Sequence, residues 1–201
     1  MHRSRFFSAG WILLLAITTQ FSCQQRPSKE DMLAGMGEED LRALQSMNST
    51  PLHVDGISSP SIKQSTEVQL SDDTKIIGVS HHGKYRAYPV SLLSGMMDHV
   101  VNDTVHSQDG NGVSPVTVTY CSMTDCARVV TGDLPEGVSH LDLGTLGLLD
   151  GGLALRWKGR QFKQNDQIEG LPVIAFELTT GEEWKSKLPE TVVFAGLSKK
   201  Y

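Results

Sequence analysis

The segment from Lys84 to Arg128 constrains the fold more than any other part of the chain. From Pro115 to Cys121 its residues alternate, which predicts a strand with two distinct faces. Val116, Val118 and Tyr120 share one face, and Thr117, Thr119 and Cys121 share the other. Ser122 to Asp125 then forms a four-residue turn before a returning strand, 126–131. Cys121 and Cys126, the two cysteines of the chain other than Cys23, therefore flank a hairpin loop.

The residues after Pro89 have the spacing of a helix. Proline is tolerated in the first turn of a helix, and apolar residues recur at intervals of three and four through 90–101. This stripe contains Leu92, Leu93, Met96, Met97, Val100 and Val101. On such a helix His99 and Asp103 lie one turn apart at the edge of the stripe, with Asn102 beside them near the helix end.

Short apolar runs separated by glycine and proline predict strands elsewhere. The ranges 75–80 and 85–88 form a hairpin around a His-His-Gly-Lys turn, and later runs follow at 140–143, 146–149, 153–157, 173–178 and 192–194. No second long helix and no internal repeat is found. The sequence therefore predicts a strand-dominated α+β domain, with antiparallel hairpins or sheets and one central amphipathic helix at about 90–101.

The first 22 residues have the layout of an export signal. Arg3 and Arg5 precede an apolar run, 6–17, that is shorter than the roughly 20 residues a membrane-spanning helix requires. Cys23 follows a small serine, which is typical of the lipid-accepting cysteine of a bacterial lipoprotein, although simple cleavage to a soluble exported protein is the alternative. We expect a polar tether with a short helix over 23–54 and a single domain over 55–201.

The net charge of the chain is −5, and no basic patch with interleaved aromatic residues occurs. This composition disfavours a nucleic-acid partner. The expected partner is instead the membrane, reached through a lipid on Cys23, at the bacterial cell envelope.

Cys121 and Cys126 support three readings. An oxidising compartment favours a disulfide between them, and this is the reading we prefer. A zinc or copper site would combine His99 with both cysteines. A role in thiol chemistry would use either the pair reversibly, as a labile redox disulfide, or Cys121 as a nucleophile with His99 as base and Asp103 orienting it.

Arg86, Tyr88, Asn102 and Asp103 are further candidate site residues. They could line a cleft for an anion or a sugar. The reading we prefer is a buried polar joint that fixes the predicted helix on the hairpin, because such side chains satisfy free backbone groups.

Four motifs, in order, resemble those of the family called domain of unknown function 3179. They are Asp55-Gly56-Ile57, Arg86-Ala87-Tyr88-Pro89, Asp98-His99-Val100-Val101-Asn102-Asp103 and Thr119-Tyr120-Cys121. The family pattern has His-Glu where this chain has Asp98-His99, and Cys-x-x-Cys where four residues separate Cys121 from Cys126. The resemblance covers roughly 55–184 and adds Tyr120 to the candidate site, but it implies no established activity. We therefore expect an exported, lipid-anchored binding or structural module, with a metal or thiol-redox enzyme using His99, Cys121 and Cys126 as the alternative.

Overall fold

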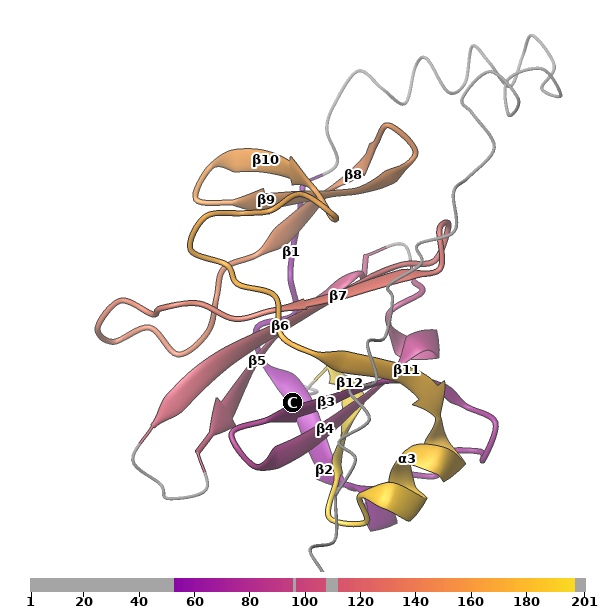
Figure 1. Cartoon of the computed structure of the whole chain (residues 1–201). Coiled ribbons are helices and arrows are strands. Elements are labelled where there is room, and N and C mark those ends of the chain that lie inside the picture. Colours follow the sequence, from indigo (N-terminus) through magenta and orange to yellow (C-terminus); the bar gives the residue numbers. More distant parts are fainter. Residues whose placement is uncertain (1–52, 96, 108–111, 198–201) are drawn as a thin grey trace, which may run out of the picture.

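The computed structural model describes residues 53–95, 97–107 and 112–197 (Figure 1). Strands dominate these ranges. They are β1 (Val54–Asp55), β2 (Pro60–Gln64), β3 (Lys75–His81), β4 (Lys84–Pro89), β5 (Val100–His106), β6 (Val113–Cys121), β7 (Cys126–Val130), β8 (Gly144–Leu149), β9 (Gly152–Trp157), β10 (Arg160–Lys163), β11 (Phe176–Thr180) and β12 (Val192–Leu197). The helical elements of the described ranges are two 3-10 turns, η1 (Ser65–Glu67) and η2 (Val90–Leu92), and one α-helix, α3 (Gly181–Lys187).

The strands form three sheets, with the three-stranded sheet β5-β6-β7 in the middle (Figure 1). A five-stranded sheet, β11-β3-β4-β12-β2, packs on one face, and a four-stranded sheet, β1-β8-β9-β10, packs on the other. All pairings are antiparallel except that of β12 with β4. The strand-dominated, largely antiparallel architecture predicted from the sequence is therefore confirmed.

The alternation predicted for 115–121 places the two faces of the central sheet in two separate cores. Val116, Val118 and Tyr120 pack toward the five-stranded sheet with Val101 and Tyr88. Cys121 packs toward the four-stranded sheet with residues that include Val100, Val130, Leu153 and Leu155. Since β6 has no face turned to solvent, its side chains are buried from residue 115 to residue 121.

Helix α3 covers the outer face of the five-stranded sheet. Its Thr180 cap accepts a hydrogen bond from the backbone N–H of Glu183, as expected for a threonine at this position. Trp184 lies directly on Gly78 of β3, where an added Cβ would be 2.5 Å from the indole ring. Ile76, Ala87 and Val193 complete this third core. Within the described ranges, no helix has the length and apolar character needed to cross a membrane.

The predicted central helix at 90–101 is wrong. Only Val90–Leu92 forms a 3-10 turn, and Val100–His106 is strand β5. The segment Val-Val-Asn-Asp-Thr-Val-His is rich in β-branched residues, which favour strands. Val100 and Val101 are buried as expected, but Leu92 and Met97 are exposed, and Met96 lies outside the described residues.

The predicted hairpin at 75–88 is confirmed as β3 and β4, which pair from Ile76 with Pro89 to His81 with Lys84. Its turn places His82 and Gly83 at positive φ, 50° and 71°. Strand β2 was missed, and the run at 140–143 forms no strand. The export signal, Cys23 and most of the tether lie outside the described residues.

Candidate functional site

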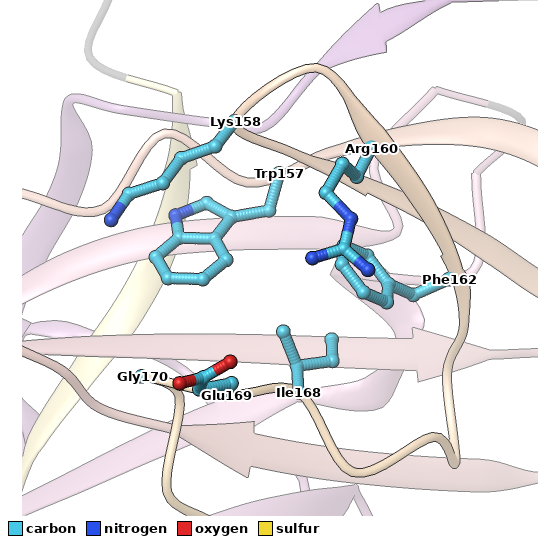
Figure 2. A pocket seen from close by; sticks show the side chains of 7 residues that line it. All are labelled: Trp157, Lys158, Arg160, Phe162, Ile168, Glu169 and Gly170. Atoms are coloured by element: carbon cyan, nitrogen blue, oxygen red, sulfur yellow. The ribbon is translucent and has the colours of Figure 1, made fainter.

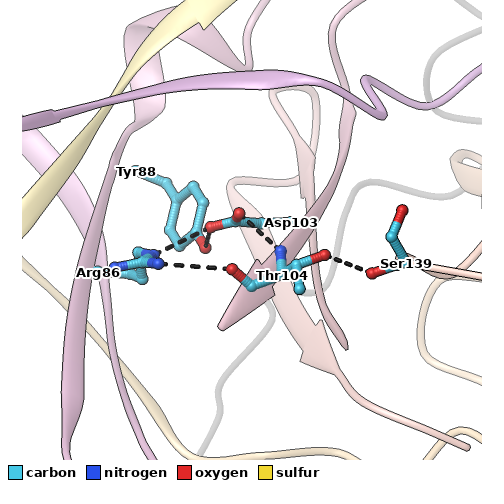
Figure 3. A network of polar contacts seen from close by, with 5 residues as sticks. All are labelled: Arg86, Tyr88, Asp103, Thr104 and Ser139. Carbon is cyan, nitrogen blue, oxygen red and sulfur yellow. Dashed lines mark hydrogen bonds and ion pairs between the residues drawn. The ribbon is translucent and has the colours of Figure 1, made fainter. Parts of the chain in front are cut away.

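Asp103 is the centre of a buried polar network between β5 and the five-stranded sheet (Figure 3). Its carboxylate accepts hydrogen bonds from Arg86 Nε at 3.2 Å and from the hydroxyl of Tyr88 at 2.7 Å. The backbone N–H of Thr104 donates to its second oxygen at 2.6 Å. The side chain of Asp103 is 5% exposed and that of Arg86 is 15% exposed. Burial, together with Asp103, raises the pKa of Tyr88 well above its usual value, so the phenol remains a donor.

Asn102 performs the corresponding role on the opposite face of β5. Its side-chain N–H donates to the carbonyl of Leu143 at 2.9 Å, and its side-chain oxygen accepts from the hydroxyl of Thr117 at 2.8 Å. Gly56 lies against this amide, and a Cβ there would be 2.4 Å from the Leu143 carbonyl oxygen. The chain is also paired on both sides of Gly56. Asp55 pairs with Gly144 of β8, and Ile57 pairs with Val101 of β5 as an isolated bridge.

Consecutive residues of β5 thus join the central sheet to both outer layers. Asn102 connects it to the segment before β8, and Asp103 connects it to β4. Because these side chains are largely buried and are hydrogen-bonded to neighbouring groups of the chain, they do not line an open cleft for an anion or sugar. The geometry is that of the buried polar joint predicted from the sequence, although it joins strands and not a helix.

His99 and Cys121 line one pocket of about 200 Å³ between the central and four-stranded sheets. The Nδ1 atom of His99 lies 3.0 Å from the carbonyl oxygen of Tyr120, which makes Nδ1 the protonated nitrogen. Val54, Met123 and Leu148 give the pocket an apolar wall. Asp103 is bonded to Arg86 and Tyr88 and therefore does not orient His99. The predicted Cys-His-Asp arrangement is not formed.

The two cysteines face each other across the β6–β7 hairpin, as predicted. Cys121 nevertheless carries a free, buried thiol, so the predicted Cys121–Cys126 disulfide is not formed. Among the described residues, no group of three or more His, Cys, Asp or Glu side chains is placed to hold a metal ion. The zinc or copper site of His99, Cys121 and Cys126 stays a prediction.

Tyr120 takes part in a contact that the sequence did not reveal. Its hydroxyl donates to Asp125 at 2.6 Å, and Lys75 Nζ lies 2.6 Å from the same carboxylate oxygen. Burial and this carboxylate raise the pKa of Tyr120, while hydrogen bonds from Lys75 and then Tyr120 lower the pKa of Asp125. Asp125 adopts a positive φ of 49°. The contact links the hairpin turn to the start of β3.

A pocket of about 330 Å³ lies beside the β9–β10 hairpin, outside every predicted site (Figure 2). Trp157, Arg160 and Phe162 line one side, and Ile168 and Glu169 line the other. Lys158 Nζ is 4.2 Å from the centre of the Trp157 ring, and the Arg160 guanidinium is 5.3 Å from that of Phe162. Such cation–π contacts hold both cations over aromatic faces. The Trp-Lys-Gly-Arg turn was the sequence signal that could have indicated this site.

A second, larger pocket of about 680 Å³ shares Ile168, Glu169 and Gly170 with the first. Arg128 of β7 and residues 167–173 line it. Gly170, at φ +81°, allows the close approach of Trp157, because an added Cβ would be 3.2 Å from the indole. The two pockets therefore adjoin on either side of one short segment.

Comparison with known proteins gives a family match. A model described as Protein of unknown function (DUF3179) matches residues 54–201. No curated protein and no solved structure gives a significant match. The residues that join the three layers of sheet, Gly56, Arg86, Tyr88, Asn102 and Asp103, lie within the matched range.

Proposed function

The chain belongs to the DUF3179 family, described as of unknown function, and we propose that it is an exported, lipid-anchored binding module of the bacterial cell envelope. The observation that carries the binding role is the pair of adjoining pockets on either side of Ile168–Gly170. Their volumes, about 330 and 680 Å³, fall in the range typical of small-molecule sites. Aromatic faces, apolar walls and a few charged groups line them, which is the usual composition of such sites.

The proposed localisation at the cell envelope depends on the N-terminal residues. Arg3, Arg5 and the apolar run 6–17 have the order of an export signal, and Cys23 stands where a lipoprotein cysteine would stand. The family match begins at residue 54. The tether proposed for 23–54 would then hold a folded domain away from the membrane.

Labelling the tryptophans with 5-fluorotryptophan tests the binding role by ¹⁹F NMR. A library of neutral and charged aromatic fragments is added to the full chain, and we expect some fragments to shift the Trp157 resonance saturably. Trp184 is the internal control, because it belongs to α3, which packs on the outer face of the five-stranded sheet, and it should not respond. Trp157→Phe assigns the signal. If no fragment moves the Trp157 resonance at millimolar concentration, the pockets are not a binding site.

Detergent partitioning tests the proposed lipid anchor. We expect the mature protein to enter the detergent phase and Cys23→Ala to lose this behaviour. A mature N-terminus that begins downstream of Cys23, measured by mass spectrometry, would contradict the lipid anchor.

The alternative is a thiol enzyme. The shared pocket of His99 and Cys121 favours it, because Nδ1 bonds the Tyr120 carbonyl and leaves Nε2 as the basic nitrogen. Cys121 is only 1% exposed, however, so a substrate would first have to open this pocket. The binding role requires no such rearrangement and is preferred.

A further inference from the structure

We propose that Arg128 is the anion-binding residue of the larger pocket, and that the ligand is a small molecule with a carboxylate or phosphate group and an apolar body. This inference rests on the binding role proposed above and names the chemistry of its ligand. The argument begins with the hydrogen bonds of Arg128.

Arg128 is a buried cation with incomplete hydrogen bonding. The residue is 7% exposed, its Nη1 donates to the carbonyl of Gln164, and its Nε has no hydrogen-bond partner. In the described part of the chain, no carboxylate lies within ion-pair distance of its guanidinium. A buried charge without a counter-charge is costly, and a bound anion would supply the missing partner.

The contrast with Arg86 shows what is missing. Arg86 directs Nε to the Asp103 carboxylate and Nη2 to the Thr104 carbonyl, so the edge of its guanidinium formed by these two nitrogens is occupied. Arg128 uses Nη1 instead, which leaves the Nε–Nη2 edge without a partner among the described residues. Two parallel N–H donors on one edge are the arrangement that binds a carboxylate or phosphate through two oxygens.

The position of Arg128 is set before any ligand binds. Gln164, which accepts from Arg128 through its carbonyl, is itself buried and donates from its side chain to the Thr119 hydroxyl at 3.0 Å and to the Cys126 carbonyl at 3.1 Å. The main chain of Arg128 is held by strand β7, opposite Thr119. A donor fixed in this way loses little conformational freedom on binding.

The lining of the larger pocket is the basis for the apolar body proposed for the ligand. Ile168, Leu171, Pro172 and Val173 provide apolar walls near the guanidinium, and the volume of about 680 Å³ suits a small organic molecule. Two acidic groups oppose a negative ligand: Glu169 lines the pocket, and Asp166 interacts electrostatically with Arg128 from outside ion-pair distance. Burial lowers the pKa of Arg128, yet arginine remains charged at neutral pH.

The test uses three probes of similar shape: benzoate, phenyl phosphate and the neutral benzyl alcohol. Each is titrated into the full chain in detergent at low ionic strength, with affinity measured by calorimetry. We expect at least one anion to bind saturably and Arg128→Met to weaken it by about tenfold or more, since hydrogen bonds to charged groups contribute roughly this much. Arg128→Lys, which keeps the charge and loses the two-donor edge, should weaken it less. Lys187→Met on α3 removes the same charge far from the pocket and should leave binding unchanged.

Glu169→Gln gives a test that does not depend on the folding of an Arg128 variant. Glu169 is exposed, and removal of its negative charge should tighten anion binding by about two- to fivefold. Preference for benzoate or for phenyl phosphate distinguishes a carboxylate ligand from a phosphate ligand. Benzyl alcohol that binds as tightly as both anions would overturn the role of Arg128 while supporting a binding module. Anion binding that is equal in the wild-type protein and Arg128→Met would overturn the inference too, and no binding by any probe would count against both proposals.

Discussion

Asp103→Asn should destabilise the domain strongly although it changes almost no volume. One carboxylate oxygen accepts from both Arg86 and Tyr88, and the other accepts from the backbone N–H of Thr104. An asparagine has a single acceptor oxygen. In one orientation its NH₂ group faces the Thr104 N–H, and in the other it faces the donors of Arg86 and Tyr88. Either orientation therefore sets donor against donor and leaves the Arg86 cation without its counter-charge.

Removing one partner of a buried ion pair costs about 3–5 kcal/mol. The Arg86 side chain is 15% exposed, so partial hydration of the guanidinium reduces this cost, and we expect Asp103→Asn to lose about 2–4 kcal/mol. Relative to a typical domain stability of about 5–15 kcal/mol, that loss is easily measured. The assay is urea unfolding of the full chain followed by tryptophan fluorescence, with the m-value checked for two-state behaviour.

Two further variants determine whether the network causes the loss. Asp73→Asn makes the same chemical change at an exposed position and should be nearly neutral. Tyr88→Phe removes one hydrogen bond to the carboxylate, and its effect should not add to that of Asp103→Asn, because both variants remove the same contact. A loss below about 1 kcal/mol for Asp103→Asn, or full additivity, would refute the assignment of Asp103 as the residue that joins β5 to β4.

Two other predictions concern the turn and the layer contacts. The pKa of Asp125 is lowered in the folded state by Lys75 and Tyr120, so its stabilising contribution is present above the unfolded pKa near 4 and is lost as pH falls through the folded value. Because the Lys75–Asp125 pair is exposed, wild type should be more stable than Asp125→Asn by less than about 1 kcal/mol. This stability difference should be constant from about pH 7 to 5 and disappear in acid. A stability difference that grows in acid would contradict the lowered pKa of Asp125. Gly56→Ala should cost about 1–3 kcal/mol or more because its Cβ would overlap Leu143, Asn102 and Val100. The matched Gly152→Ala, whose Cβ would meet nothing closer than 3.9 Å, should melt near the wild-type temperature, and equal melting of the two variants would show that the layers can separate at Gly56.

Local patterns in the sequence predicted those parts of the fold in which the pairing strands are neighbours in the chain. The hairpins β3–β4 and β6–β7 close over short turns, and strict alternation on β6 assigns its faces. The helix predicted for 90–101 is not formed, because a few apolar residues at three-to-four spacing also fit a turn followed by a strand. The β-branched residues Val100, Val101, Thr104 and Val105 were the better guide to β5, since such residues pack well in sheets.

The candidate site was predicted in part for a similar reason. Arg86, Tyr88, Asn102 and Asp103 are polar residues at the ends of apolar runs, and polar groups in such places must find partners, so their burial together was foreseeable. The pockets near Trp157 and Arg128 were not, because they form where β7, the β9–β10 hairpin and a segment without regular structure meet. Nothing in the spacing of Arg128 and Ile168 indicates that they line one pocket. Tertiary packing alone determines that contact.

Strand β12 has a consequence for how the chain reaches this structure. It lies between β4 and β2, pairing Val193 with Ala87 on one side and with Lys63 on the other. The last described strand is therefore an interior strand, and β2 cannot join the five-stranded sheet until 192–197 has been synthesised. Contacts this distant in sequence slow folding. A chain that lacks 192–197 therefore has no strand to connect β2 with β4, and the five-stranded sheet stays incomplete until that stretch is available.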